Sequence, residues 1–111
     1  MAMTLDEVRR LALALPEAHE ADHHGMASFR VRGRIFATVP DDEHVRVMLD
    51  EEDVLAAVAE DPAACAPFRW GSQVKCVVVA LEHAQPVLVR ELLGDAWRRR
   101  APRTLAREHD S

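Results

Sequence analysis

The chain has 111 residues, of which 49% are hydrophobic and 30% are charged, and its formal net charge is -5. This length fits one domain, and the composition excludes an intrinsically disordered chain. Charged side chains interrupt every apolar run before it reaches the roughly 20 residues of a membrane helix, and the N-terminus has no signal-peptide pattern, so we expect a cytoplasmic protein without a membrane span.

The first predicted element is a helix that begins after Thr4. Thr4 and Glu7 have the spacing of a capping box, and hydrophobic residues then recur on one helical face up to Leu15. Pro16 ends this helix, because the residue before a proline avoids the α conformation. The polar, histidine-rich segment 17–25 follows and is predicted to be a loop.

Alternating hydrophobic and polar residues predict three strands in succession. The first covers residues 27–32, the second 34–39 and the third 44–49. A tight turn at Gly33-Arg34 joins the first two strands, and a polar turn over 40–43 joins the last two. Short turns between consecutive strands are typical of an antiparallel meander.

The second half of the chain begins with a predicted helix over residues 50–60, for which Asp50 is a good N-cap. Prolines break the chain that follows, so residues 62–72 are predicted to form a loop anchored by aromatic side chains. A β-branched apolar run over 74–81 predicts a buried strand. The last helix is predicted over 86–100, and Gly94 within it suggests close packing of that helix on the sheet.

These elements predict an α+β fold with the order α-β-β-β-α-β-α. It consists of an antiparallel β-meander plus one further long strand, with the helices packed on one face. We expect a single domain over residues 1–104, a frayed tail over 105–111, and a monomer. The face of the sheet that the helices leave uncovered is where a binding function is expected.

Several segments together carry a family resemblance. They are Leu5 to Glu17, Ser28 to Ala37 across the predicted hairpin, the acidic start of the second helix, Trp70-Gly71, and Glu91 to Trp97. With these residues the chain resembles the MmcQ/YjbR family of small bacterial proteins. The resemblance implies a frataxin-type (CyaY-like) α+β sandwich and DNA binding through a "double wing", in which hairpin loops flank an element that contacts the groove. It implies no catalytic residues.

Arginines gather on one face of the predicted meander. Arg30 and Arg32 lie two residues apart and therefore on the same side of a strand, about 7 Å from each other. Arg46 falls on the same face, Arg34 lies at the hairpin tip, and Lys75 lies on the following strand. Such cations suit phosphate contacts, so this face is the predicted nucleic-acid interface, with weak and salt-dependent binding. The alternative is a solvated face whose charges only maintain solubility.

A second basic cluster ends the last predicted helix. It consists of Arg98, Arg99, Arg100 and Arg103. Cations at a helix C-terminus complement the macrodipole without any ligand. The alternative role is an electrostatic contact with nucleic acid, or with an acidic surface such as residues 50–53 of another copy.

The segment before the meander contains three histidines, His19, His23 and His24, together with acidic residues. These side chains include enough donors for a divalent metal. However, no regular spacing directs three of them to one point. We therefore expect a surface loop without a metal, whose charge varies between about pH 5 and 7.

The sequence contains no catalytic motif, such as a Gly-rich phosphate loop or a nucleophile elbow. Cys76 lies among valines and is interpreted as a small buried hydrophobe, while Cys65 has no neighbour that would activate its thiol. We therefore expect no enzyme and no cofactor. The leading hypothesis is a DNA-binding protein, and the alternative is a protein-interaction or small-ligand module that uses the open face and the loop around Trp70.

Overall fold

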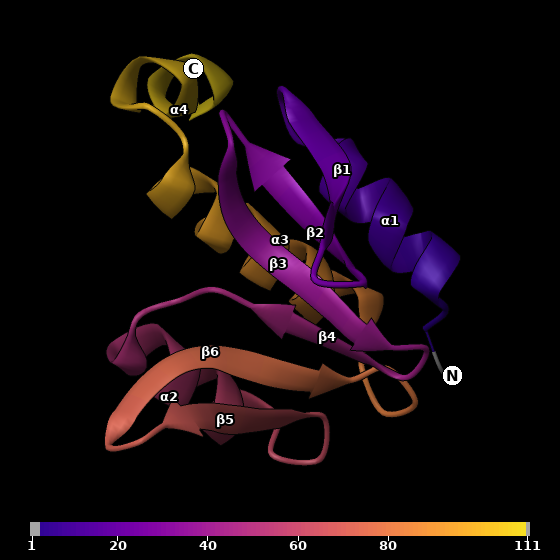
Figure 1. Ribbon diagram of the computed structural model, residues 1–111. Coiled ribbons are helices and arrows are strands. Elements are labelled where there is room, and N and C mark those ends of the chain that lie inside the picture. The colour runs from indigo at the N-terminus through magenta and orange to yellow at the C-terminus, as the bar shows by residue number, and fades with distance from the viewer. Residues whose placement is uncertain (1–2, 111) are drawn as a thin grey trace.

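A six-stranded antiparallel sheet forms the centre of the structure, a computed structural model that describes residues 3–110 (Figure 1). The strands are β1 (Ala18–His23), β2 (Met26–Val31), β3 (Arg34–Asp41), β4 (His44–Val47), β5 (Cys65–Trp70) and β6 (Gln73–Ala80). Their spatial order is β1-β2-β3-β4-β6-β5, so β1 and β5 form the two edges.

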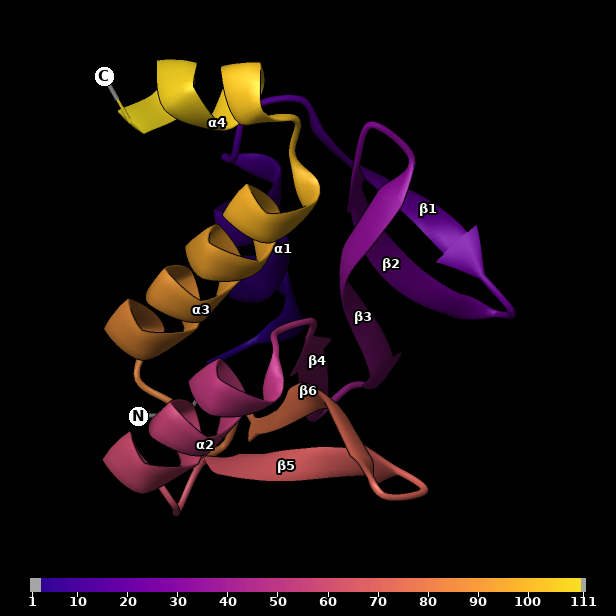
Figure 2. The same cartoon turned by 90° about the vertical axis from the view of Figure 1, so that its left-hand side faces the viewer.

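Helices lie on one side of this sheet. They are α1 (Leu5–Leu13), α2 (Glu51–Glu60), α3 (Pro86–Arg100) and α4 (Arg103–Asp110). Figure 2 shows α1, α2 and α3 against the same face, while the opposite face is uncovered. Within residues 3–110, no helix is long and apolar enough to cross a membrane.

The core forms between the helices and the covered face of the sheet. Phe29, Ala37, Val47 and Val77 occupy neighbouring positions on successive strands, and all four are buried. Helix α3 packs on β3 and β4, helix α2 packs on β6, and the side chain of Trp97 on α3 is completely buried. The indole Nε1–H of Trp97 donates a hydrogen bond of 2.9 Å to the carbonyl oxygen of Pro16. This bond ties α3 to the end of the first helical segment.

The predicted α+β fold class is confirmed, but two strands were not predicted. The predicted loop over 17–25 contains β1, and the predicted loop over 62–72 contains β5. Both are edge strands. Strand β1 is mostly polar because it buries little, and Pro67 is tolerated in β5 because an edge strand needs fewer N–H donors. The observed order is therefore α-β-β-β-β-α-β-β-α-α rather than α-β-β-β-α-β-α.

The C-terminal segment also differs from the prediction. Residues 103–110 form α4, whereas a frayed tail was expected over 105–111; residue 111 lies outside the described residues. Leu105 is buried, and the His109 ring meets the Trp97 ring edge-on at a centroid distance of 5.0 Å. Arg98 pairs with Asp110 at 3.0 Å. Pro102 thus interrupts the helix, and these contacts hold the next one in place.

Gly94 does not mark a close approach of α3 to the sheet. A Cβ atom at this position would have the Nη1 of Arg98, 3.8 Å away, as its nearest neighbour, which is an ordinary van der Waals distance. We expect Gly94→Ala to raise the free energy of unfolding by about 0.5–1 kcal/mol, because alanine restricts the unfolded chain and favours the helix. Urea denaturation followed by circular dichroism measures this change.

Gly33→Ala is the matched control. Gly33 has a φ of +80°, which an L side chain adopts only with strain, so the same exchange is expected to lower the free energy of unfolding by about 1 kcal/mol. If Gly94→Ala were as destabilising as Gly33→Ala, the result would show that α3 packs too closely at Gly94 to admit a side chain.

Candidate functional site on the open face

The centre of the uncovered sheet face carries polar side chains. Ser28, Thr38 and Arg46 occupy paired positions on β2, β3 and β4. They alternate with the core residues of these strands and therefore lie on the face without helices. Ser28 and Thr38 are nevertheless buried, because longer neighbouring side chains rise around them.

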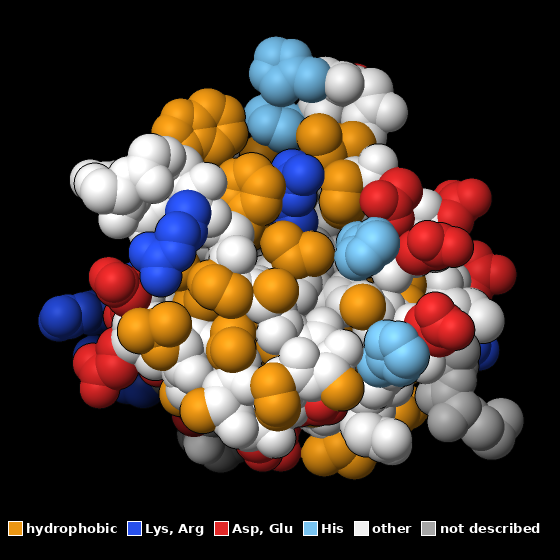
Figure 3. All heavy atoms as spheres, turned by 90° about the horizontal axis from the view of Figure 1, so that it is seen from below, with side chains coloured by type: hydrophobic (Ala, Val, Ile, Leu, Met, Phe, Trp, Pro, Cys, Tyr) orange, Lys and Arg blue, Asp and Glu red, His pale blue; other side chains and the backbone are white. Residues whose placement is uncertain are grey.

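A groove of about 410 Å³ lies on this face. Thr38, Arg46 and Met48 form its floor, one wall consists of His23, His24 and Met26, and the other consists of Phe68, Trp70, Lys75 and Cys76. The walls come from the β1–β2 turn and the β5–β6 hairpin, at opposite edges of the sheet. In Figure 3, where the open face lies toward the top, hydrophobic side chains surround a basic one and histidines lie beside them.

Arg46 is a half-buried cation in the groove. Its guanidinium carbon lies 4.6 Å from the centre of the Phe68 ring, which is a cation–π distance. Its buried Nε has no hydrogen-bond partner within residues 3–110, and none of the residues that line the groove is acidic. A buried N–H donor without a partner is costly, so Arg46 carries an unpaired donor within the described residues.

Exposed aromatic surface lies beside this cation. Trp70 is 72% exposed at the end of the β5–β6 hairpin, and its ring centroid is 6.3 Å from that of Phe68. The rings of His23 and His24 lie 4.5 Å apart on the other wall. The groove therefore combines exposed aromatic side chains with the cation of Arg46.

The thiols are not poised as nucleophiles. Burial raises the pKa of Cys76, although the positive charge of Arg46 opposes the shift. Burial, reinforced by Asp61 and Glu60, raises the pKa of Cys65 to about 11. Both thiols are therefore protonated at neutral pH. Cys76 is buried as expected, and Cys65 is also buried, since it belongs to β5 rather than to a loop.

The structure divides the predicted basic face. Arg46 and Lys75 line the same groove. Arg30 lies on the same side of the sheet, but its Nε donates to the hydroxyl of Ser28 at 3.1 Å, and a terminal nitrogen donates to the carbonyl of Asp22. It is therefore partly occupied by its own chain.

Arg32 and Arg34 do not join this face. Arg32 has a φ of +51°, so the strand alternation ends before it, and its guanidinium pairs with Glu17. The positive charge of Arg34 contributes to lowering the pKa of Arg100, which burial lowers most. Arg34 thus lies near the end of α3. The prediction that Arg30 and Arg32 point the same way was wrong, because the tight turn rotates the chain at Arg32.

The basic cluster at the end of α3 finds partners within the chain. Arg99 pairs with Asp50 at 2.9 Å, so the acidic surface that was considered on another copy is supplied by the same molecule. The backbone N–H of Asp53 and the charge of Arg99 both lower the pKa of Asp50. Arg100 donates to the carbonyl of Ile35 at 3.1 Å, and Arg103 is exposed on α4.

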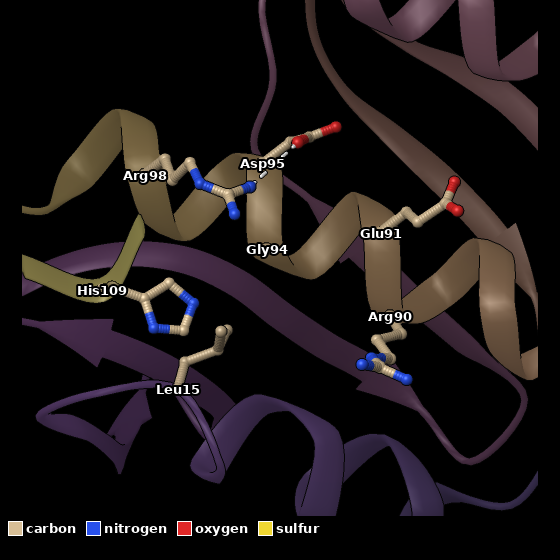
Figure 4. Close-up of a pocket in the computed structure, with 7 residues that line it drawn as sticks. All are labelled: Leu15, Arg90, Glu91, Gly94, Asp95, Arg98 and His109. Carbon is tan, nitrogen blue, oxygen red and sulfur yellow. Dashed lines mark hydrogen bonds and ion pairs between the residues drawn. The ribbon is translucent and has the colours of Figure 1, made fainter. Parts of the chain in front are cut away.

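A second hollow of about 380 Å³ lies on the helical side, between α3, α4 and Leu15. Figure 4 shows charges of both signs along α3, with Arg90 and Glu91 near one end and the Arg98–Asp95 ion pair near the other, where His109 points toward Leu15. Acids balance the arginines at this place. It therefore lacks the charge preference and the exposed aromatic surface of the groove.

The histidines of the predicted loop separate. His19 lies opposite Arg30 in the β1–β2 ladder, whereas His23 and His24 belong to the groove wall. Among the residues that the structure describes, no three His, Cys, Asp or Glu side chains are placed to hold a metal. His23 and His24 lie across the groove from Trp70 because β1 and β5 form the two edges of the sheet, and neither strand was predicted. The sequence signal for β5 was the spacing of Phe68 and Trp70, two residues apart, which is the period of a strand.

Comparisons with known proteins agree with this fold. The model of the YjbR family matches residues 13–99. The crystal structure of Deinococcus radiodurans protein DR2400, with the family-model domain DUF419, is similar with a TM-score of 0.73 and 21% sequence identity, covering 87% of this chain and 78% of that chain. No curated protein matches. Because the family match spans most of the sequence, the resemblance is confirmed and this chain belongs to the YjbR family.

Proposed function

We propose that this protein is a monomeric, cytoplasmic, nucleic-acid-binding protein without catalytic activity, and that the open-face groove is its contact surface. The observation that carries the proposal is the exposed Trp70 beside Arg46 and Lys75, in a groove without acids. Aromatic rings that stack on bases, combined with cations that contact phosphates, are the usual means of binding single strands. The chain as a whole carries a net charge of -5, so a groove lined by two cations and no acid is a locally positive surface on an acidic protein.

Lack of catalysis is part of the same proposal. The thiol at the groove, Cys76, has a raised pKa and is not a thiolate at neutral pH. A small-ligand function is the second candidate, because a groove of about 410 Å³ lies within the range of small-molecule sites.

Binding is tested by fluorescence anisotropy with labelled single-stranded and duplex DNA at about 50 and about 200 mM salt. We expect binding at the lower salt concentration that weakens at the higher one, because phosphate contacts release counterions. Trp70→Ala combined with Lys75→Glu is expected to weaken binding by at least about tenfold. Both side chains are exposed, so the fold is retained.

Arg10→Glu is the matched control. Arg10 is exposed on α1, on the helical side of the sheet, and its reversal changes the net charge as Lys75→Glu does. Absence of binding at the lower salt concentration, or an equal loss in the Arg10 variant, would refute the proposed surface.

A further inference from the structure

We infer that the groove accepts one unpaired nucleotide unit, a planar base with its phosphate, and not the backbone of a duplex. The inference rests on the proposed function and names its ligand more narrowly. The shared chemistry occurs in a free mononucleotide and in a nucleotide of a single strand, and the experiment below separates these sources.

The walls of the groove suit a planar base. Trp70 is 72% exposed at one wall, and the paired rings of His23 and His24 stand at the other. Met26 and Met48 complete an apolar surface between them, and thioethers make favourable contacts with aromatic rings. A flat aromatic group covered by these side chains would remove the exposed tryptophan face from water.

The polar groups of the groove suit one anionic group. Arg46 lies on the floor with a buried Nε that has no partner within residues 3–110, and Phe68 fixes its guanidinium from one side. Lys75 is exposed at the wall. The acidic partners that occupy Arg32, Arg98 and Arg99 have no counterpart among the lining residues. The positive charge of the groove is therefore not balanced by a lining residue, and a phosphate would balance it.

The distribution of the remaining cations argues against a duplex. Duplex binders commonly neutralise about 6–10 phosphates with cations spread along the backbone. Here Arg32 pairs with Glu17, and Arg99 with Asp50 across the helical layer. Arg46 and Lys75 supply the permanent positive charge of the groove, which matches one or two phosphates.

The test compares five probes with the full chain: thymidine monophosphate, thymidine, benzoate, an oligothymidylate of about twelve nucleotides, and a hairpin duplex of the same length. Tryptophan fluorescence reports stacking, and Trp70→Phe assigns the signal, because Trp97 is buried. We expect the oligothymidylate to quench Trp70 and to bind at least about tenfold more tightly than the hairpin. Its log–log salt dependence is expected to have a slope of about -1.4, for two phosphate contacts on a single strand.

The probes also identify the source of the nucleotide. Thymidine monophosphate that binds as tightly as the oligothymidylate, and at least about tenfold more tightly than thymidine or benzoate, indicates a free nucleotide. Binding of the oligothymidylate with little binding of the monophosphate indicates a single strand. Both results support the inference.

Other results overturn it. Equal affinity for hairpin and oligothymidylate without quenching of Trp70 overturns the unpaired nucleotide but leaves nucleic-acid binding intact. Benzoate that binds as tightly as thymidine monophosphate shows that the groove takes any aromatic anion. Absence of binding to both DNA probes refutes the proposed function instead, and a monophosphate that still binds would leave the nucleotide site standing.

Discussion

Replacing Trp97 with Ala is expected to lower the free energy of unfolding by about 3–5 kcal/mol, which is the usual cost of truncating a buried tryptophan. Trp97 belongs to α3 and its side chain is fully buried. Its indole donates to the Pro16 carbonyl at 2.9 Å, and its ring contacts His109. The exchange therefore opens a cavity and removes contacts with segments far apart in the sequence.

Urea denaturation followed by circular dichroism measures this loss, and Trp70→Ala is the matched control. Trp70 is 72% exposed, so its removal is expected to change the free energy of unfolding by no more than about 0.5 kcal/mol. Trp97→Phe keeps an aromatic ring but leaves the Pro16 carbonyl without its donor, and we expect an intermediate loss of about 1–3 kcal/mol. Similar stabilities for Trp97→Ala and Trp70→Ala would contradict the core described for this chain.

The sequence pattern predicted the strands that border the core and missed those at the edges. Strands β2, β3, β4 and β6 each place a row of hydrophobic residues under the helices, and that burial imposes the alternation. Strand β1 has only Ala18 and Ala21 as apolar residues, and β5 contains Pro67. Local patterns are weak where little is buried, so edge strands resemble loops in sequence.

The same limit applied to the candidate site. Its walls follow from the hairpins that the edge strands form, so His23 and Trp70 could not be placed on one surface before those strands were known. Arg46 was predicted on the open face, because the alternation in β4 is regular. Lys75 lines the same groove, but it lies at the register shift between β5 and β6, so alternation alone does not place it there. Arg32 was placed on the wrong face because its own backbone has a left-handed conformation, which ends the alternation of the strand. The pairing of Arg99 with Asp50, 49 residues away, depends on tertiary structure alone.

Arg46→Met is expected to weaken binding of the oligothymidylate by about 1.5–3 kcal/mol, the range for a hydrogen bond to a charged group, while stabilising the free protein by about 1 kcal/mol. A buried N–H donor without a partner costs about 1–3 kcal/mol. Methionine has a similar length, keeps contact with the Phe68 ring, and gives up about 0.5–1 kcal/mol of cation–π attraction. The balance favours the variant in the absence of ligand.

Arg30→Met separates this effect from a general loss of positive charge on the open face. Arg30 is also half-buried, but its guanidinium donates to Ser28 and to the Asp22 carbonyl. Its replacement removes bonds already made and is expected to lower the free energy of unfolding by about 1 kcal/mol. We expect Arg46→Met to raise the free energy of unfolding and Arg30→Met to lower it, as measured by urea denaturation. This result, combined with a larger loss of binding for Arg46→Met, identifies Arg46 as a ligand-binding residue whose unpaired donor destabilises the free protein. Equal destabilisation by both exchanges would instead show that Arg46 has a structural role, because replacing a structural arginine lowers the stability of the protein.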